Sequence, residues 1–148
     1  MARFFSLLVT LFIAAAAVAA PVAVPVEARA GLGGIACNVN RFKIVTTLAA
    51  TSAAVGKIPT ADSTTASAVT TAKAGLKSAS DGIGQIALAL VTGGAPPAAA
   101  RDQTQKGLLD AQTALTSIND PTAASSTASA MSKLAAAIQD GNNVVADC

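Results

Sequence analysis

The 148-residue chain contains no histidine, no tryptophan and no tyrosine. Without histidine it lacks a Ser-His-Asp triad, an imidazole metal ligand and a base that titrates near neutral pH. Glu27 is the only glutamate, so a catalytic carboxylate pair would need aspartates, which fall mainly at predicted helix ends, where capping explains them. Thr70 with Lys73 as its base is formally available, but such residues are usual on a polar helix face. We expect no enzyme, no metal site and no cofactor.

Aromatic residues are also scarce, at 3% of the chain, and all are phenylalanine. The formal charge is only +2, and the basic residues are scattered, with no Tyr or Trp to stack on bases, so we expect no nucleic-acid partner. Apolar residues make up 52% of the chain, and many of them are alanine. This composition indicates a thin core between closely approaching helices rather than the bulky core of a β-sandwich.

The chain begins with a pattern typical of a secretory signal peptide. Arg3 precedes an apolar run that changes from bulky residues (FFSLLVTLFI) to small ones (AAAAVAA). Cleavage after Ala19 places Ala17 and Ala19 at the small-residue positions, so we assign residues 1–19 to the signal peptide. The alternative is an uncleaved membrane anchor, against which the Ala-rich end of the run argues. We expect a protein that is secreted, extracellular or in the cell wall, with no transmembrane segment after cleavage.

Residues 20–36 have proline early, glycine late and no helical period, which indicates an extended spacer or a pro-segment. Trimming after Arg29 is one alternative for this segment. The glycines of residues 31–34 do not form a phosphate-binding loop, because no strand precedes them and no G-K-[ST] follows. Residues 37–148 are long enough for one domain with one modest core.

These residues carry four amphipathic segments, in which apolar residues recur every three or four positions. The strongest seam lies in the second segment, at Val69, Ala72, Leu76, Ala79, Ile83, Ile86 and Leu90. The other seams are Phe42, Val45, Leu48 or Ala49, and Val55 in the first; Thr104, Leu108, Ala111, Leu115 and Ile118 in the third; and Ala124, Ala128, Met131, Leu134 or Ala135, Ile138 and Val145 in the fourth. Each segment therefore has one apolar stripe.

Glycine and proline separate the segments, at residues 56–59, 93–97 and 119–121. Because short connections favour antiparallel neighbours, the pattern predicts an all-α, up-down-up-down four-helix bundle. Thr60 and Asp120 are the expected N-caps, and Asp62 is expected in a first turn. The second segment, residues 61–92, is long and contains three glycines, so we expect a kink or break within residues 80–84.

The chain has two cysteines, Cys37 before the first segment and Cys148 at the last position. In a secreted protein such a pair indicates a disulfide. An up-down-up-down bundle supports this pairing, because it brings the start of the first helix and the end of the fourth to the same end. A metal site or a reactive thiol would lack partners, since there is no histidine.

The helical region resembles the fungal hydrophobic surface binding protein A and the related cell-wall galactomannoproteins. The resemblance rests on the leader, the stretches CNVNRFKIVTTLAATSAAVGKI and ALALVTGGAPPAAARDQTQKGLLDAQTAL, and the scarcity of aromatics. It covers roughly residues 37–148 and consists of diffuse features rather than a motif of fixed chemistry. It implies a secreted, non-catalytic protein that binds hydrophobic surfaces, lipids or cell-wall polymers and can recruit secreted hydrolases.

The stretch IALALV at residues 86–91 is apolar on most sides and is the expected contact patch. The candidate contact or ligand-lining residues are Ile83, Ile86, Leu88, Leu90, Val91, Leu108 and Leu115. The alternative is that these residues face a neighbouring helix. Three functions stay open: a surface-binding protein, an extracellular lipid or fatty-acid binding protein with a cavity between helices, and a structural wall component or effector.

Overall fold

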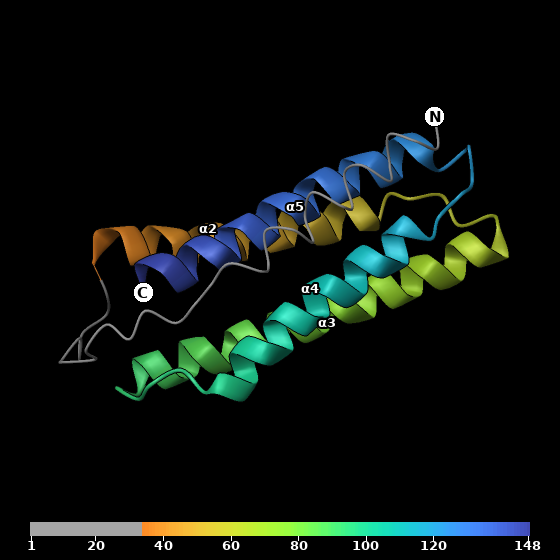
Figure 1. The fold of residues 1–148 in the computed structure, drawn as a ribbon. Helices are drawn as coiled ribbons and strands as arrows, with labels where there is room; N and C mark the ends of the chain where they lie inside the picture. Colours follow the sequence, from red (N-terminus) through yellow and green to blue (C-terminus); the bar gives the residue numbers. More distant parts are fainter. Residues whose placement is uncertain (1–33) are drawn as a thin grey trace, which may run out of the picture.

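The computed structural model describes residues 34–148, so the predicted signal peptide and most of the predicted spacer lie outside the described residues. The described chain forms four helices, α2 (Ile35–Val55), α3 (Ser63–Val91), α4 (Ala98–Thr116) and α5 (Ala124–Asp147). They run alternately up and down (Figure 1). This confirms the predicted all-α four-helix bundle. The helical region begins slightly earlier than predicted, because Ile35 and Ala36 already belong to α2.

The four helices form two antiparallel pairs, as Figure 1 shows: α2 with α5, and α3 with α4. Contacts within each pair are extensive, whereas α2 with α3 and α4 with α5 contact each other far less. Side-chain hydrogen bonds add to the contacts within pairs, from Thr47 Oγ1 to Asp140 across α2–α5 and from Gln85 to Gln103 across α3–α4. Each pair is therefore a tighter unit than the bundle that the two pairs make together.

Glycine sets the close contact between α3 and α4. A Cβ atom on Gly75 would lie 2.7 Å from the carbonyl oxygen of Gly107, and one on Gly82 would lie 2.7 Å from that of Ala100. The two backbones touch at these positions, which only glycine allows. Of the kink or break predicted within residues 80–84, the break is wrong, because α3 runs unbroken from Ser63 to Val91. Gly82 lowers the helix propensity locally, but its contact with α4 keeps the segment helical.

The helix ends follow the sequence signals with some shifts. Asp62, rather than Thr60, is the N-cap of α3, and its carboxylate accepts a hydrogen bond from the Thr65 N–H at 2.7 Å. This bond lowers the pKa of the Asp62 carboxyl below its usual value. Asp120 accepts from the Thr122 N–H and so caps the turn before α5, whose own N-cap is Ala123. Gly93 follows α3 with a φ of 77°, a conformation that favours glycine.

The hydrophobic core occupies one half of the bundle, next to the α2–α3 and α4–α5 connections. It draws on the C-terminal half of α2, on residues 69–79 of α3, on the C-terminal half of α4 and on residues 130–137 in the central part of α5. Its largest fully buried apolar side chains include Leu115, Leu134 and Val55. Toward the other end the two pairs diverge (Figure 1), and burial falls along the α3 seam from Val69 to the half-buried Leu90.

Candidate surface-binding site

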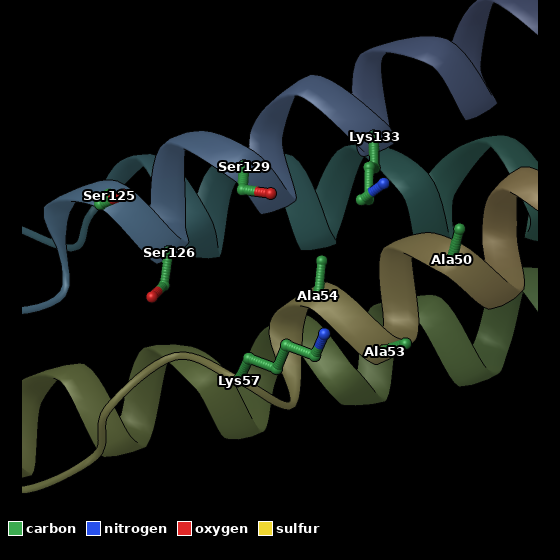
Figure 2. A pocket seen from close by; sticks show the side chains of 8 residues that line it. All are labelled: Ala50, Ala53, Ala54, Lys57, Ser125, Ser126, Ser129 and Lys133. Atoms are coloured by element: carbon green, nitrogen blue, oxygen red, sulfur yellow. The ribbon is translucent and has the colours of Figure 1, made fainter.

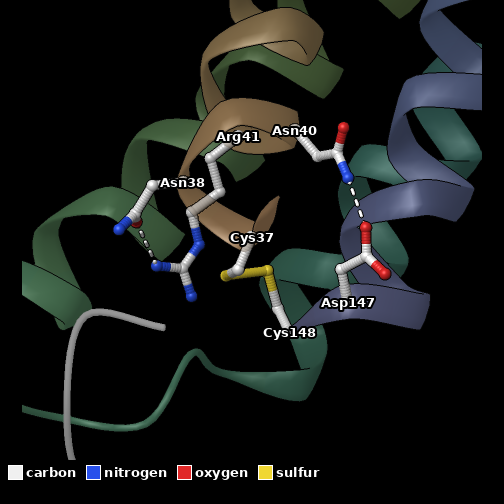
Figure 3. Close-up of a disulfide and its surroundings, with 6 residues drawn as sticks. All are labelled: Cys37, Asn38, Asn40, Arg41, Asp147 and Cys148. Carbon is white, nitrogen blue, oxygen red and sulfur yellow. Dashed lines mark hydrogen bonds between the residues drawn. A yellow bond between two sulfur atoms is a disulfide. The ribbon is translucent and has the colours of Figure 1, made fainter. Parts of the chain in front are cut away.

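A disulfide joins the start of α2 to the end of α5, at the end of the bundle where the two helix pairs diverge. Cys37 Sγ and Cys148 Sγ are 2.07 Å apart, with their Cα atoms at 5.1 Å, which confirms the predicted pairing. Beside it, the Asn40 side-chain amide donates to the Asp147 carboxylate at 2.6 Å, and the Arg41 guanidinium donates to Asn38 at 3.3 Å (Figure 3). The first turns of α2 are thus fixed to the last turn of α5.

Large apolar side chains are exposed around this same end of the bundle. Phe42 is 69% exposed, Leu88 is 66% exposed and Val91 is 83% exposed. We call the set the apolar end: Ile35, Val39 and Phe42 of α2, Leu88 and Val91 of α3, and Val145 of α5. Only two other large apolar side chains in the described chain are comparably exposed, Val45 and Leu109, and both lie near the middle of their helices. Exposed apolar surface is thus concentrated at one end.

The predicted contact residues divide between this end and the core. Leu88 and Val91 are exposed and belong to the apolar end, whereas Ile86 and Leu90 are half-buried nearby. Ile83 packs against the core cluster. Leu108 and Leu115 are core residues, at 5% and 0% exposed, so they match the alternative in which an apolar residue faces a neighbouring helix.

The seam predicted for α2 is wrong at its N-terminal end. Phe42 and Val45 were predicted to face the core but are exposed, and the buried stripe is Cys37, Asn40, Ile44, Leu48, Thr51 and Val55. The polar members of this stripe conceal it, since Asn40 bonds to Asp147 and the Thr51 hydroxyl donates to the Thr47 carbonyl at 2.7 Å. Ile35, Val39 and Phe42 recur every three or four residues, the signal that could have identified a second apolar face.

The end of the α5 seam was also misplaced. Ala124, Ala128 and Val145 were predicted to face the core, but all three are exposed. The buried residues of α5 are Ala130, Leu134 and Ala137, in the central part of the helix. The first and last turns of α5 therefore contribute little to the core.

Two grooves mark the outer surfaces of the pairs, and both are open to solvent. One, of about 410 Å³, lies between α2 and α5 and is lined by alanine, serine and two lysines (Figure 2). The other follows α3 and α4 and is lined mainly by Thr, Ser and Ala, with Asp110. Neither groove has the enclosed apolar lining that a lipid cavity requires.

Among residues 34–148 no group of His, Cys, Asp or Glu side chains is placed to hold a metal ion. None of the helices in that region is long and apolar enough to span a bilayer. No protein-family model matches the chain, and comparison with curated proteins and with solved structures gives no match either.

Proposed function

We propose that this chain is a secreted, non-catalytic protein that binds hydrophobic surfaces through its apolar end. The observation that carries the proposal is the clustering of exposed Leu, Val, Ile and Phe side chains at the divergent end of the bundle. Large exposed apolar patches on soluble proteins mark interaction sites. Covering a Leu or Phe side chain on an apolar solid would contribute about 1.5–3 kcal/mol. The disulfide is compatible with an extracellular location.

The way the two pairs are joined supports adsorption beyond the exposed residues. Each pair is held internally, one by Cys37–Cys148 and the other by the Gly75–Gly107 backbone contact. Between the pairs, contacts are few and the core lies near the connecting loops. Separation of the pairs at the divergent end therefore disrupts little of the core. On an apolar surface, half-buried residues such as Ile86 and Leu90 would add to the contact.

Depletion of the protein from solution by polystyrene beads tests this proposal. We expect depletion at low and at high salt alike, because apolar burial is not screened. A quadruple variant with Phe42→Gln, Leu88→Gln, Val91→Gln and Val145→Gln should bind the beads at least tenfold more weakly. Each of the four native side chains is at least 66% exposed, so these substitutions should leave the core intact.

Leu109→Gln is the matched control, because Leu109 is 47% exposed but lies on α4 away from the apolar end. It should be depleted like the wild type. Equal depletion of the wild type and the quadruple variant, or depletion of the wild type that disappears at high salt, would contradict the proposal.

No specific observation favours the alternative function, a lipid-binding protein with a cavity between helices, because both grooves are open and mainly polar or alanine-lined. Binding to wall polymers or recruitment of secreted hydrolases stays a prediction of the sequence resemblance. The proposed binding to apolar solids requires only the exposed side chains of the apolar end.

A further inference from the structure

The groove between α2 and α5 is lined by lysine, serine and alanine side chains, none of which takes part in the proposed binding to apolar surfaces. It lies at the end of α2 that is far from the disulfide, and no residue of α3 or α4 lines it. Lys57, which follows the C-cap Gly56, and Lys133 of α5 reach into it from opposite sides (Figure 2). The groove is thus a surface hollow of the α2–α5 pair that is bordered by two cationic side chains.

Neither lysine has a hydrogen-bond or ion-pair partner among residues 34–148, and no carboxylate lines the groove. Of the other lysines in residues 34–148, Lys77 pairs with Asp81 at 2.7 Å and Lys106 pairs with Asp110 at 2.6 Å. Lys43 and Lys73 form no ion pair either, but they line neither groove. The groove therefore carries two positive charges and no negative one, which favours the binding of an anion.

Hydroxyl groups complete the lining. Ser125, Ser126 and Ser129 border the groove, and none of these hydroxyls has a hydrogen-bond partner in the described part of the chain. Threonines within the helices, such as Thr70 and Thr71, instead donate to the carbonyl four residues earlier. Ser125 and Ser126 also lie in the first turn of α5, where the helix dipole favours negative charge. The groove therefore offers free donors as well as positive charge.

We propose that this groove binds a phosphate dianion, either free or as the monoester headgroup of a lipid. Two ammonium groups and several hydroxyl donors match a tetrahedral dianion with multiple acceptor oxygens. A single carboxylate carries one negative charge and would neutralise only one of the two lysines. An uncharged sugar would leave both uncompensated. The remaining lining residues are alanines, whose small side chains leave a groove of about 410 Å³ for the ligand.

Titration with inorganic phosphate at about pH 8, followed by amide chemical shifts at constant ionic strength, tests the site. We expect saturable shifts at Lys57 and at residues 125–133. Lys57→Gln and Lys133→Gln should each weaken binding about fivefold, as expected for losing one charge contact near the surface. Lys77→Gln removes the same charge from α3 and should leave the affinity unchanged. Shifts that do not saturate, or lysine variants that bind like the wild type, would overturn the proposal.

Vesicles distinguish the two sources of phosphate. If the ligand is a lipid headgroup, phosphatidylcholine vesicles that contain phosphatidic acid should retain more protein than pure phosphatidylcholine vesicles, and both groove variants should lose the difference. If the ligand is free phosphate, the chemical-shift titration should saturate while vesicle binding ignores the lysines. Absence of both effects refutes the site. Because Lys57 and Lys133 lie away from the apolar end, these outcomes are independent of bead adsorption.

Discussion

Gly75 of α3 and Gly107 of α4 lie against each other, so that a Cβ atom on Gly107 would be 2.5 Å from the Gly75 carbonyl oxygen. The same atom would be 2.6 Å from the backbone nitrogen of Ala79. Backbone atoms cannot move aside as a flexible side chain can, so any larger residue must push the helices apart. This contact explains why the α3–α4 pair is a tight unit.

Gly107→Ala should therefore destabilise the protein, although alanine is the better helix former. We expect the free energy of unfolding to fall by about 1–3 kcal/mol, the usual range for overpacking. Gly84→Ala is the control, because nothing lies within 4 Å of a Cβ atom there, and it should raise stability by up to about 1 kcal/mol. Urea denaturation measures both, and a stabilising Gly107→Ala would contradict the backbone contact.

Removal of the disulfide should destabilise the bundle strongly. Cys37 and Cys148 are 111 residues apart in sequence, and closing such a loop is worth about 4–5 kcal/mol in the chain-entropy model. The double variant Cys37→Ser with Cys148→Ser should lose a large part of this amount in urea denaturation. The wild type in reducing agent should behave like the double variant. If both samples unfold at the same urea concentration as the oxidised wild type, the disulfide does not stabilise the bundle.

The Asp62 cap makes the stability of α3 depend on pH. Its pKa in the folded chain is lowered by the Thr65 N–H, so its contribution is present above the usual pKa near 3.8 and is lost as the pH falls through the folded value. Asp62→Ala should therefore have a lower urea midpoint than the wild type at pH 7, and the gap should narrow as the pH falls below 3.8 and the carboxylate is protonated. Asp62→Asn keeps an accepting oxygen, so its gap to Asp62→Ala should not depend on pH. If the difference in urea midpoint between the wild type and Asp62→Ala does not change with pH, the charge of Asp62 does not contribute to the cap.

Leu115 and Leu109 separate the roles of buried and exposed leucines on α4. Leu115 is fully buried and Leu109 is 47% exposed. Leu115→Ala should lower the free energy of unfolding by about 2–5 kcal/mol, whereas Leu109→Ala should change it by about 0.5 kcal/mol or less. Thermal or urea unfolding compares the pair. Similar losses in both variants would contradict the location of the core.

Several features of the fold could be predicted from the sequence because they depend on local signals. Glycine and proline between apolar stripes gave the four helices, and the seams of α3 and α4 lie where the three- and four-residue spacing predicted. The Cys37–Cys148 bridge followed from the antiparallel order. These inferences agree because periodicity, turns and topology all point to one bundle.

Other features depend on contacts between distant segments and could not be predicted. Apolar periodicity failed in α2 because Asn40 is buried with Asp147 as its partner, a pairing across 107 residues. The expected break in α3 assumed that glycine weakens a helix, but the partner of Gly82 is the α4 backbone, which the local sequence does not show. The apolar end was found only in part, since Leu88 and Val91 were expected as contacts but Phe42 was not.

The most direct test of the account is hydroxyl-radical footprinting of the protein adsorbed on polystyrene, compared with the protein in solution. Surface binding through the apolar end predicts that oxidation of Phe42, Leu88 and Val91 falls several-fold on adsorption while that of Leu109 changes little. All four side chains are exposed in the free protein, so each reports on what the surface covers. Protection of Leu109 equal to that of Phe42 and Leu88, or no protection at the apolar end, would contradict the account.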